Sequence, residues 1–415
     1  MKKTLGNCLV GQSGGPTVAI NASLCGVINR VIETNAYNTV YGMVNGIQGL
    51  LENKIINLSE QFTSEEERKK LKTTPAMYLG SCRYKLPSIS ENPNVYTQIF
   101  DTLKDLDIQT FFYIGGNDSM DTVLQLSIFA KEHNYPVQVI GIPKTIDNDL
   151  PVTDHTPGYG SAAKYVATTM LEIAHDTYIY DMPSVTIVEI MGRNAGWLTA
   201  AAALARNEYN ASPDLIYLPE VRLSRESFIE DVKRLQAKRQ NIIIAVSEGV
   251  KGEDGDYLSA SGGAVDSFGH KALAGAATVL EEWITADIGC KARSVILNVL
   301  QRSAAHICSK TDINESVMIG SAAVDASLKG VTGQMVCFKR ISDHPYKVEI
   351  ITSHVDGIAN YEKKIPSEWI TADQSDVTQD FIDYARPLIE GEMQISFANG
   401  IPVYCNIAHI QQVQK

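Results

Sequence analysis

The chain has 415 residues, of which 44% are hydrophobic and 20% are charged, so it can fold into two domains of roughly 150–200 residues each. Its formal net charge of −12 argues against a nucleic-acid partner, because an acidic protein repels phosphate except where local cations or backbone N–H groups reverse the field. No apolar run approaches the roughly 18 residues of a membrane span, and the N-terminal residues lack a signal-peptide core, so we expect neither.

Short runs of β-branched or aromatic residues alternate with longer helical stretches along the chain. The predicted strands cover residues 7–10, 39–44, 110–114, 137–142, 185–190, 215–218, 242–246, 295–299 and 335–338. The predicted helices cover residues 18–33, 95–106, 120–132, 161–174, 198–205, 226–238, 271–283 and 316–328. Strand–helix alternation at this spacing predicts an α/β protein with mostly parallel sheets and crossover helices.

Two segments between these elements have distinctive compositions. Residues 64–70 are a run of charged side chains, which predicts the solvated face of a helix. Residues 250–263 are rich in Gly, Asp and Ser, which predicts an exposed loop.

Cysteine and histidine usage limits the chemistry. The seven cysteines are scattered, odd in number and never spaced as CxxC, so we expect reduced thiols in a cytoplasmic protein. The eight histidines have no HxH or HExxH spacing, and there is no GxSxG motif, which disfavours a zinc site and a serine hydrolase. His155, between Asp154 and Thr156, is interpreted as a structural loop residue.

In α/β folds, ligands bind at the carboxyl ends of the strands, so the residues just after each strand carry the functional signal. Gly14 and Gly15 follow the first strand and precede a helix. Glycine lets backbone approach a ligand, and the helix N-terminus offers N–H groups to phosphate. The pattern is neither a Walker A loop nor GxGxxG, and a tight turn without a ligand explains it equally well.

A second candidate is Gly115-Gly116-Asn117-Asp118-Ser119, where another predicted strand ends and a helix begins. Asn117 or Asp118 capping the helix is one explanation. A second phosphate or Mg²⁺ site is the other, and it better explains two adjacent glycines beside Asn and Asp.

The third candidate is residues 143–149, Pro-Lys-Thr-Ile-Asp-Asn-Asp. Asp147 could take a proton from an attacking hydroxyl, Asp149 could hold a metal or shape the loop, and Lys144 could neutralise phosphate charge. Phosphoryl transfer needs this combination of a base, cations and positioned donors. A turn built from Asp and Asn remains the alternative.

The last set comprises Met191-Gly192-Arg193, Glu248, Arg293 and Arg302, most of them near predicted strand ends. Arginine suits bidentate binding of a phosphate monoester, and Glu248 could accept hydrogen bonds from sugar hydroxyls. Each residue alone is more typical of a surface ion pair, so the hypothesis depends on their coming together.

Taken together, the motifs resemble the phosphofructokinase family from about residue 5 to about residue 340. The motifs that carry the resemblance are Gly14-Gly15, Asn21, Gly80-Ser81-Cys82-Arg83-Tyr84, residues 114–119, 143–149 and 188–193, Ser247-Glu248-Gly249 and Leu300-Gln301-Arg302. The remaining 75 or so residues resemble the extended tail of longer members.

The resemblance implies two Rossmann-like domains with the active site in the cleft between them. Residues 1–158 and roughly 300–345 would bind the phosphoryl donor. Residues 159–299 and the tail, 346–415, would bind the sugar phosphate. It also implies a homodimer or homotetramer and Mg²⁺ as cofactor.

The resemblance also implies the roles of individual residues in phosphorylating fructose 6-phosphate. Asp147 would activate the 1-hydroxyl, and Thr145 would lie beside the transferred group. Arg302 would hold the 6-phosphate, with Arg293 reaching it from a neighbouring subunit. The residues expected to bind the substrates are Gly15, Arg83, Thr145, Ile146, Asp147, Met191, Gly192, Arg193, Glu248, Arg293 and Arg302.

Two positions indicate the donor, and both also count among the expected catalytic residues. ATP-using members typically have glycine where this chain has Asp118 and Lys144. These side chains would fill the space needed by the α-phosphate of ATP, and Asp118 would repel it. Lys144 can still bind the smaller pyrophosphate, so the resemblance implies a pyrophosphate-dependent enzyme.

Three departures from the family pattern affect the details. Asn117 stands where the family usually has an aspartate linked to Mg²⁺, and a neutral amide is a weaker ligand for a hard cation. The metal would then be held through water, or by Asp118 or Asp147. Ser184 and Val299 replace an arginine and a histidine or tyrosine that contact substrate in many members.

Three alternatives stay open at this stage. They are an ATP-dependent phosphofructokinase, a catalytically silent regulatory subunit that binds sugar phosphate, and an enzyme that also accepts a larger substrate such as sedoheptulose 7-phosphate.

Overall fold

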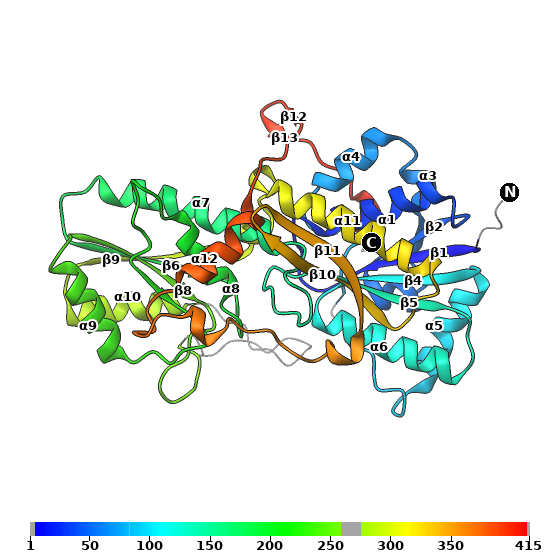
Figure 1. Cartoon of the computed structure of the whole chain (residues 1–415), viewed down its shortest axis with the longest axis horizontal. Helices are drawn as coiled ribbons and strands as arrows, with labels where there is room; N and C mark the ends of the chain where they lie inside the picture. Colours follow the sequence, from blue (N-terminus) through cyan, green and yellow to red (C-terminus); the bar gives the residue numbers. More distant parts are fainter. Residues whose placement is uncertain (1–4, 83, 259–274, 413–415) are drawn as a thin grey trace.

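The computed structural model describes residues 5–82, 84–258 and 275–412. Two α/β domains lie side by side along the long axis of the molecule (Figure 1). The blue and cyan N-terminal segments form the core of one domain, and the green middle of the chain forms the other. None of the helices in the described part of the chain has the length and apolar character of a membrane span.

Within the described residues, the first domain is built on a seven-stranded sheet. Its order is β11 (Tyr346–His354), β10 (Gln334–Asp343), β5 (Gln138–Pro143), β4 (Ile108–Gly115), β1 (Asn7–Gln12), β2 (Val40–Met43) and β3 (Ile55–Asn57). The central strands from β10 to β2 run parallel, and β11 and β3 close the two edges antiparallel.

Successive side chains of each central strand point to opposite faces of the sheet, and both faces are apolar. Val10 and Phe112 contribute to one core, together with α1 (Ile20–Thr34) and α11 (Lys310–Leu328). Leu9 and Phe111 contribute to the opposite core, together with α5 (Pro93–Asp105) and α6 (Asn117–Glu132). The central strands β1, β4 and β5 are therefore buried on both sides, as expected for a doubly wound sheet.

The second domain contains a four-stranded parallel sheet in the described residues. Its order is β7 (Leu215–Tyr217), β8 (Asn241–Ser247), β6 (Ser184–Ile190) and β9 (Lys291–Ile296). One face is covered by α7 (Tyr159–Tyr178), α8 (Trp197–Ala200) and α12 (Gln379–Ala385), and the other by α9 (Arg225–Gln236) and α10 (Ala276–Asp287). The predicted α/β class is confirmed.

The structure places the ends of several elements at other residues than the sequence predicted. The strand expected at 295–299 is displaced: β9 ends at Ile296, and Asn298–Arg302 form the 3₁₀ turn η2. Asn298 has a φ of 44°, a left-handed conformation that interrupts an extended strand. The helix expected at 198–205 is one short α-helical segment followed by the 3₁₀ helix η1 (Ala201–Ala205). Of the helix expected at 271–283, residues 271–274 lie outside the described residues.

The charged run forms the helix α4 (Glu65–Thr73), as predicted. Ser64 caps its N-terminus in a capping box with Glu67, and its charged side chains are largely exposed. Of the predicted loop at 250–263, residues 250–258 contain no helix or strand, and the rest lies outside the described residues. The prediction did not include α2 (Gly46–Leu51), α3 (Leu58–Gln61), β3 or β11.

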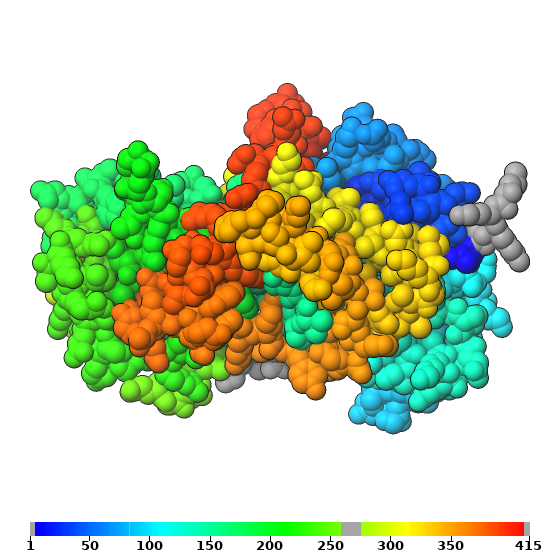
Figure 2. All heavy atoms as spheres, in the orientation of Figure 1, coloured from blue at the N-terminus to red at the C-terminus, as the bar shows by residue number. Residues whose placement is uncertain are grey.

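The C-terminal tail is shared between the domains, which differs from its expected assignment to the second domain alone. β11 pairs antiparallel with β10 and so extends the first sheet. The chain then crosses to the second domain, where Phe381 of α12 joins the apolar core. After the hairpin of β12 (Phe397–Ala398) and β13 (Ile401–Pro402) it returns, and α13 (Ala408–Gln412) brings His409 to the Tyr78 carbonyl. Orange and red tail atoms cover the junction between the domains in Figure 2.

Candidate active site

The carboxyl ends of β1, β4 and β5 lie next to one another because these strands are neighbours in the parallel sheet. The ends of β6 and β8 are likewise adjacent in the second sheet. The loops that follow all five strands line one open cavity of about 640 Å³. Its lining residues are Gly14, Gly15, Gly116, Asn117, Asp118, Ser119, Lys144, Thr145, Asp147, Asp149, Arg193, Asn194, Ala195, Glu248, Asn360, Tyr361 and Glu362.

The glycine pair after β1 makes room for two cations. A Cβ on Gly14 would lie 3.2 Å from Lys144 Nζ, and a Cβ on Gly15 would lie 3.1 Å from Arg302 Nη1. Gly14 also has a φ of 79°, which side chains disfavour. The loop therefore brings bare backbone against two positive charges, an arrangement suited to a phosphate group.

Lys144 is buried, and its ammonium group donates a hydrogen bond to the Gly15 carbonyl oxygen at 2.6 Å. Burial lowers the pKa of Lys144 to about 7, although the nearby Asp147 opposes this. An ammonium ion that has lost its water is stabilised strongly by an arriving anion. The side chain thus links the loop after β5 to the loop after β1.

Three carboxyl groups of the cavity have raised pKa values. Burial raises the pKa of Asp147, even though Lys144 and Arg302 favour its charged form. Burial and the neighbouring Asp147 raise the pKa of Asp149 to about 7, and the same two causes raise the pKa of Glu248 to about 7. Carboxyl groups with pKa values in this range can exchange protons near neutral pH.

The loop after β6 faces these residues from the second domain. Gly192 has a φ of 133°, donates its N–H to Glu248 Oε1 at 3.3 Å and accepts a hydrogen bond from the Ser247 hydroxyl at 2.6 Å. The Met191 N–H donates to Gln301 Oε1 at 3.2 Å. These contacts fix the turn that places Arg193 in the cavity wall.

Several residues predicted for the site do not line this cavity. Ile146 is 7% exposed and packs in the apolar core of the second domain. Met191 is only partly buried and also packs against that core. Arg293 lies on the edge strand β9, where its guanidinium donates to Asp176 at 3.1 Å. Arg83 falls outside the described residues.

Asn117 does not cap α6, and its side chain contacts the C-terminal tail. α6 begins at Asn117, with Gly116 at the N-cap position and no capping side chain from the described residues. The Asn117 amide instead donates to the Tyr361 carbonyl and accepts from the Asn360 N–H. Both hydrogen-bonding groups of this side chain are therefore engaged with the tail.

The structure adds residues that sequence reasoning missed. Asn360, Tyr361 and Glu362 reach the cavity from the tail, and Asn194 donates to Glu362 Oε1 at 2.8 Å. No strand-end pattern marks residues 360–362 in the sequence, so only their contacts reveal them. Asn194 directly follows Arg193 and could have been found by extending that motif by one residue.

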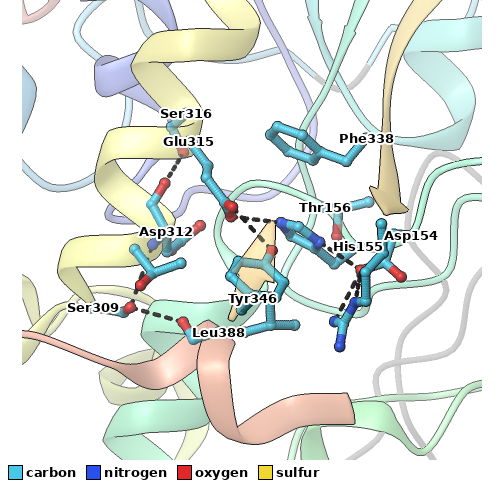
Figure 3. A network of polar contacts seen from close by, with 12 residues as sticks. Asp154, His155, Thr156, Ser309, Asp312, Glu315, Ser316, Phe338, Tyr346 and Leu388 are labelled. Atoms are coloured by element: carbon cyan, nitrogen blue, oxygen red, sulfur yellow. Dashed lines mark hydrogen bonds and ion pairs between the residues drawn. The ribbon is translucent and has the colours of Figure 1, made fainter. Parts of the chain in front are cut away.

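His155 belongs to a buried network of polar contacts (Figure 3). The His155 ring lies between Asp154 at 2.9 Å and Glu315 at 2.8 Å and stacks on Phe338. Burial alone would lower the pKa of His155, but the hydrogen bonds to these carboxylates outweigh it and raise the pKa to about 9. The prediction of a structural histidine is confirmed.

The cavity fits a magnesium ion only if a substrate supplies most of its ligands. Among the described residues, no three His, Cys, Asp or Glu side chains stand close enough to hold a metal ion by themselves. Asp118 and Asp147 both line the cavity and offer carboxylate oxygens. Mg²⁺ commonly binds through one or two carboxylates together with substrate phosphates and water.

Comparisons with known proteins agree with this geometry. The family model for phosphofructokinase matches residues 7–327. A pyrophosphate–fructose 6-phosphate 1-phosphotransferase from Methylococcus capsulatus is 40% identical over 408 residues, which cover 97% of this chain and 96% of that protein. The relative of the same name from Xanthomonas campestris is 39% identical, covering 99% and 98%. The solved structure of a pyrophosphate-dependent phosphofructokinase from Nitrosospira multiformis has a TM-score of 0.87 and 36% identity, covering 97% of this chain and 96% of that one.

Proposed function

The chain belongs to the phosphofructokinase family, and we propose that it transfers a phosphoryl group reversibly from pyrophosphate to the 1-hydroxyl of fructose 6-phosphate. The products are fructose 1,6-bisphosphate and phosphate. The observation that carries this proposal is the buried Lys144, whose ammonium group lies against the Gly15 backbone in the cavity that Asp118 also lines. Relatives that match nearly the whole chain bear the name of this activity.

Asp147 is the proposed general base. It accepts the proton of the 1-hydroxyl while that oxygen bonds to the nearer phosphorus of pyrophosphate, and the bond from that phosphorus to the bridging oxygen breaks to release phosphate. Burial raises the pKa of Asp147, which strengthens it as a proton acceptor. The Asp147 N–H donates to Thr145 Oγ1 at 3.0 Å and so orients that hydroxyl to donate to the transferred group.

The second domain is proposed to hold the sugar phosphate. Met191, Gly192 and Arg193 supply backbone groups and a cation, and Glu248 accepts hydrogen bonds from sugar hydroxyls. Arg302 is proposed to bind the 6-phosphate. Its guanidinium lies against Gly15, so this role requires the side chain to turn toward the second domain.

Arg293 is proposed to complete the phosphate site of a neighbouring subunit in a homodimer or homotetramer. It stands on β9, which is an edge of the four-stranded sheet in the described residues, and strand-edge positions are accessible to a second chain. Purified protein with Arg293→Ala should then show a raised KM for fructose 6-phosphate without a change in the pyrophosphate KM.

Donor choice is proposed to rest on Asp118 and Lys144. Both line the same cavity as Gly14 and Gly15, where the donor phosphates would bind. An added α-phosphate would meet the Asp118 carboxylate, while pyrophosphate gains the Lys144 charge without that repulsion. Mg²⁺, held by Asp118 or Asp147 and by pyrophosphate oxygens, would supply the charge neutralisation that phosphoryl transfer requires.

The proposal is tested by giving the purified chain fructose 6-phosphate, MgCl₂ and pyrophosphate. Fructose 1,6-bisphosphate should form in an aldolase-linked assay, and the reverse reaction should release pyrophosphate when phosphate is supplied. Omission of pyrophosphate should abolish the forward reaction, omission of phosphate should abolish the reverse reaction, and chelation of Mg²⁺ should abolish both. A chain that binds fructose 6-phosphate in calorimetry but turns over no donor would instead be a regulatory subunit.

A further inference from the structure

The segment Asn360-Tyr361-Glu362, here called the strap, crosses the donor side of the cavity. Its backbone is held by the Asn117 side chain, which pairs with the Asn360 N–H and the Tyr361 carbonyl. The Asn360 side chain also donates to Asp121 at 3.1 Å. Asn117 and Asp121 are four residues apart on α6 and therefore share one helix face, so the strap covers the first turn of α6 beside Asp118.

The other end of the strap is anchored on the sugar-phosphate side. Glu362 accepts from Asn194, and Asn194 Oδ1 in turn accepts from the Tyr257 hydroxyl at 3.1 Å. The next residue, Lys363, donates its N–H to the Asp149 carbonyl oxygen at 2.7 Å. The strap is thus fastened to both walls of the cavity. In Figure 1 the orange tail that contains it runs from the end of β11 along the lower edge of the molecule toward the second domain.

This position has a consequence for donor choice that rests on the proposed function. In the proposed function, the second phosphate of pyrophosphate binds at Lys144 and the donor extends no further toward Asp118. A nucleoside triphosphate carries a further phosphate and a nucleoside, which must leave past the first turn of α6, where the strap lies. We infer that the strap is a specificity element that excludes nucleoside triphosphates from the donor site, in addition to Asp118 and Lys144.

The contact between the strap and the Asn117 side chain explains why position 117 is asparagine. The strap presents one N–H and one carbonyl to this side chain, and an amide satisfies both because it is at once donor and acceptor. An aspartate would accept from Asn360 but would place a carboxylate against the Tyr361 carbonyl oxygen. Asn117→Asp should therefore loosen the strap.

Glycine substitutions test the strap without disturbing the core. Asn360 has a φ of 67° and Tyr361 is 61% exposed, so Asn360→Gly with Tyr361→Gly leaves the backbone unstrained. A matched control is Asn399→Gly with Phe397→Gly, in the β12–β13 hairpin, where φ is 52° and the ring is 60% exposed. Equal thermal midpoints for the two double variants show that the fold is kept.

ATP binding, measured by titration calorimetry without fructose 6-phosphate, is the first readout. The strap variant should bind ATP roughly tenfold more tightly than the parent and the control variant, because the side chains of two cavity-lining residues have been removed. Asn117→Asp should shift the affinity in the same direction. Equal ATP affinity in the strap variant and the parent would overturn the inference, and so would an increase shared by the control.

The second readout separates this inference from the proposed function. In an Asp118→Gly, Lys144→Gly background, the strap substitutions should raise the ratio of kcat/KM for ATP to that for pyrophosphate by a further roughly tenfold. If the parent transfers from pyrophosphate and this ratio does not move, the strap inference fails alone. If the parent transfers nothing from pyrophosphate, the proposed function fails, and ATP binding still decides the role of the strap.

Discussion

The Tyr384 hydroxyl accepts a hydrogen bond from the Asn148 side-chain amide at 2.8 Å and donates one to the Asp154 carbonyl oxygen at 2.7 Å. Asn148 is fully buried, has a φ of 54° and stands between Asp147 and Asp149. Its Oδ1 accepts from the Thr156 N–H at 3.1 Å. A tail residue thus holds the centre of the proposed catalytic loop, which fixes the carboxyl groups on either side of it.

Tyr384→Phe should lower kcat more than it raises either KM. The substitution leaves the buried Asn148 amide without its partner, which typically costs about 1–3 kcal/mol, and lets the loop move. The measurement is a full kinetic comparison together with thermal unfolding. Tyr346→Phe is the matched control, because it removes a hydroxyl that bonds Glu315 at 2.9 Å (Figure 3) rather than one that bonds Asn148. Equal losses of kcat in both variants would argue against a positioning role.

Asp147→Asn should abolish most turnover while substrates still bind. The amide keeps the size of the side chain but cannot accept the hydroxyl proton, and loss of a general base typically lowers kcat by ~10²–10⁴-fold. Steady-state kinetics in both directions should show the same loss, with each KM changed only a few-fold. A kcat within a few-fold of the parent would remove Asp147 from the mechanism.

Lys144→Gly combined with Asp118→Gly should move donor preference toward ATP. The pair removes the side chains that fill the α-phosphate region and the negative charge that repels it. The quantity to compare is the ratio of kcat/KM for ATP to kcat/KM for pyrophosphate in parent and variant. An unchanged ratio would count against this steric and electrostatic account of donor choice.

Asp149→Asn should stabilise the folded chain at alkaline pH. Burial and Asp147 raise the pKa of Asp149 from 3.8 to about 7. Between these values the folded chain keeps a proton that the unfolded chain has lost, so the free energy of unfolding falls as the pH rises through this window. Removing the charge should recover on the order of 2 kcal/mol at pH 8, allowing for partial exposure to cavity water.

The check is thermal unfolding at pH 4 and pH 8 in a chelating buffer without phosphate. The Asp149→Asn variant should melt above the parent at pH 8 and close to it at pH 4. Asp101→Asn, on the exposed face of α5, should change neither midpoint. A gain of the same size at both pH values would show that the effect does not come from ionisation of Asp149.

The sequence was sufficient to predict the parallel sheets and the cavity-lining residues that follow their strands. Gly15, Asp118, Lys144, Asp147, Arg193 and Glu248 come together because each stands just beyond a strand whose neighbours were also predicted. Local patterns carry this information, since runs of β-branched or aromatic residues and turn glycines depend only on nearby residues.

The supporting contacts could not be predicted in this way. Asn148 and Tyr384 are 236 residues apart in the chain, and Asn117 and Tyr361 are 244 apart. No local periodicity relates such pairs. The tail was consequently assigned to one domain, and Asn117 was considered only as a helix cap or a weak metal ligand, although its amide holds the strap.

The most direct test of the central claim is a comparison of donors in one preparation of the unmodified chain. Initial rates with fructose 6-phosphate and MgCl₂ are measured across matched concentrations of pyrophosphate and ATP. We predict a kcat/KM for pyrophosphate that exceeds the value for ATP by at least roughly a hundredfold, since both Lys144 and Asp118 favour the smaller donor. Equal or better turnover with ATP would contradict the account.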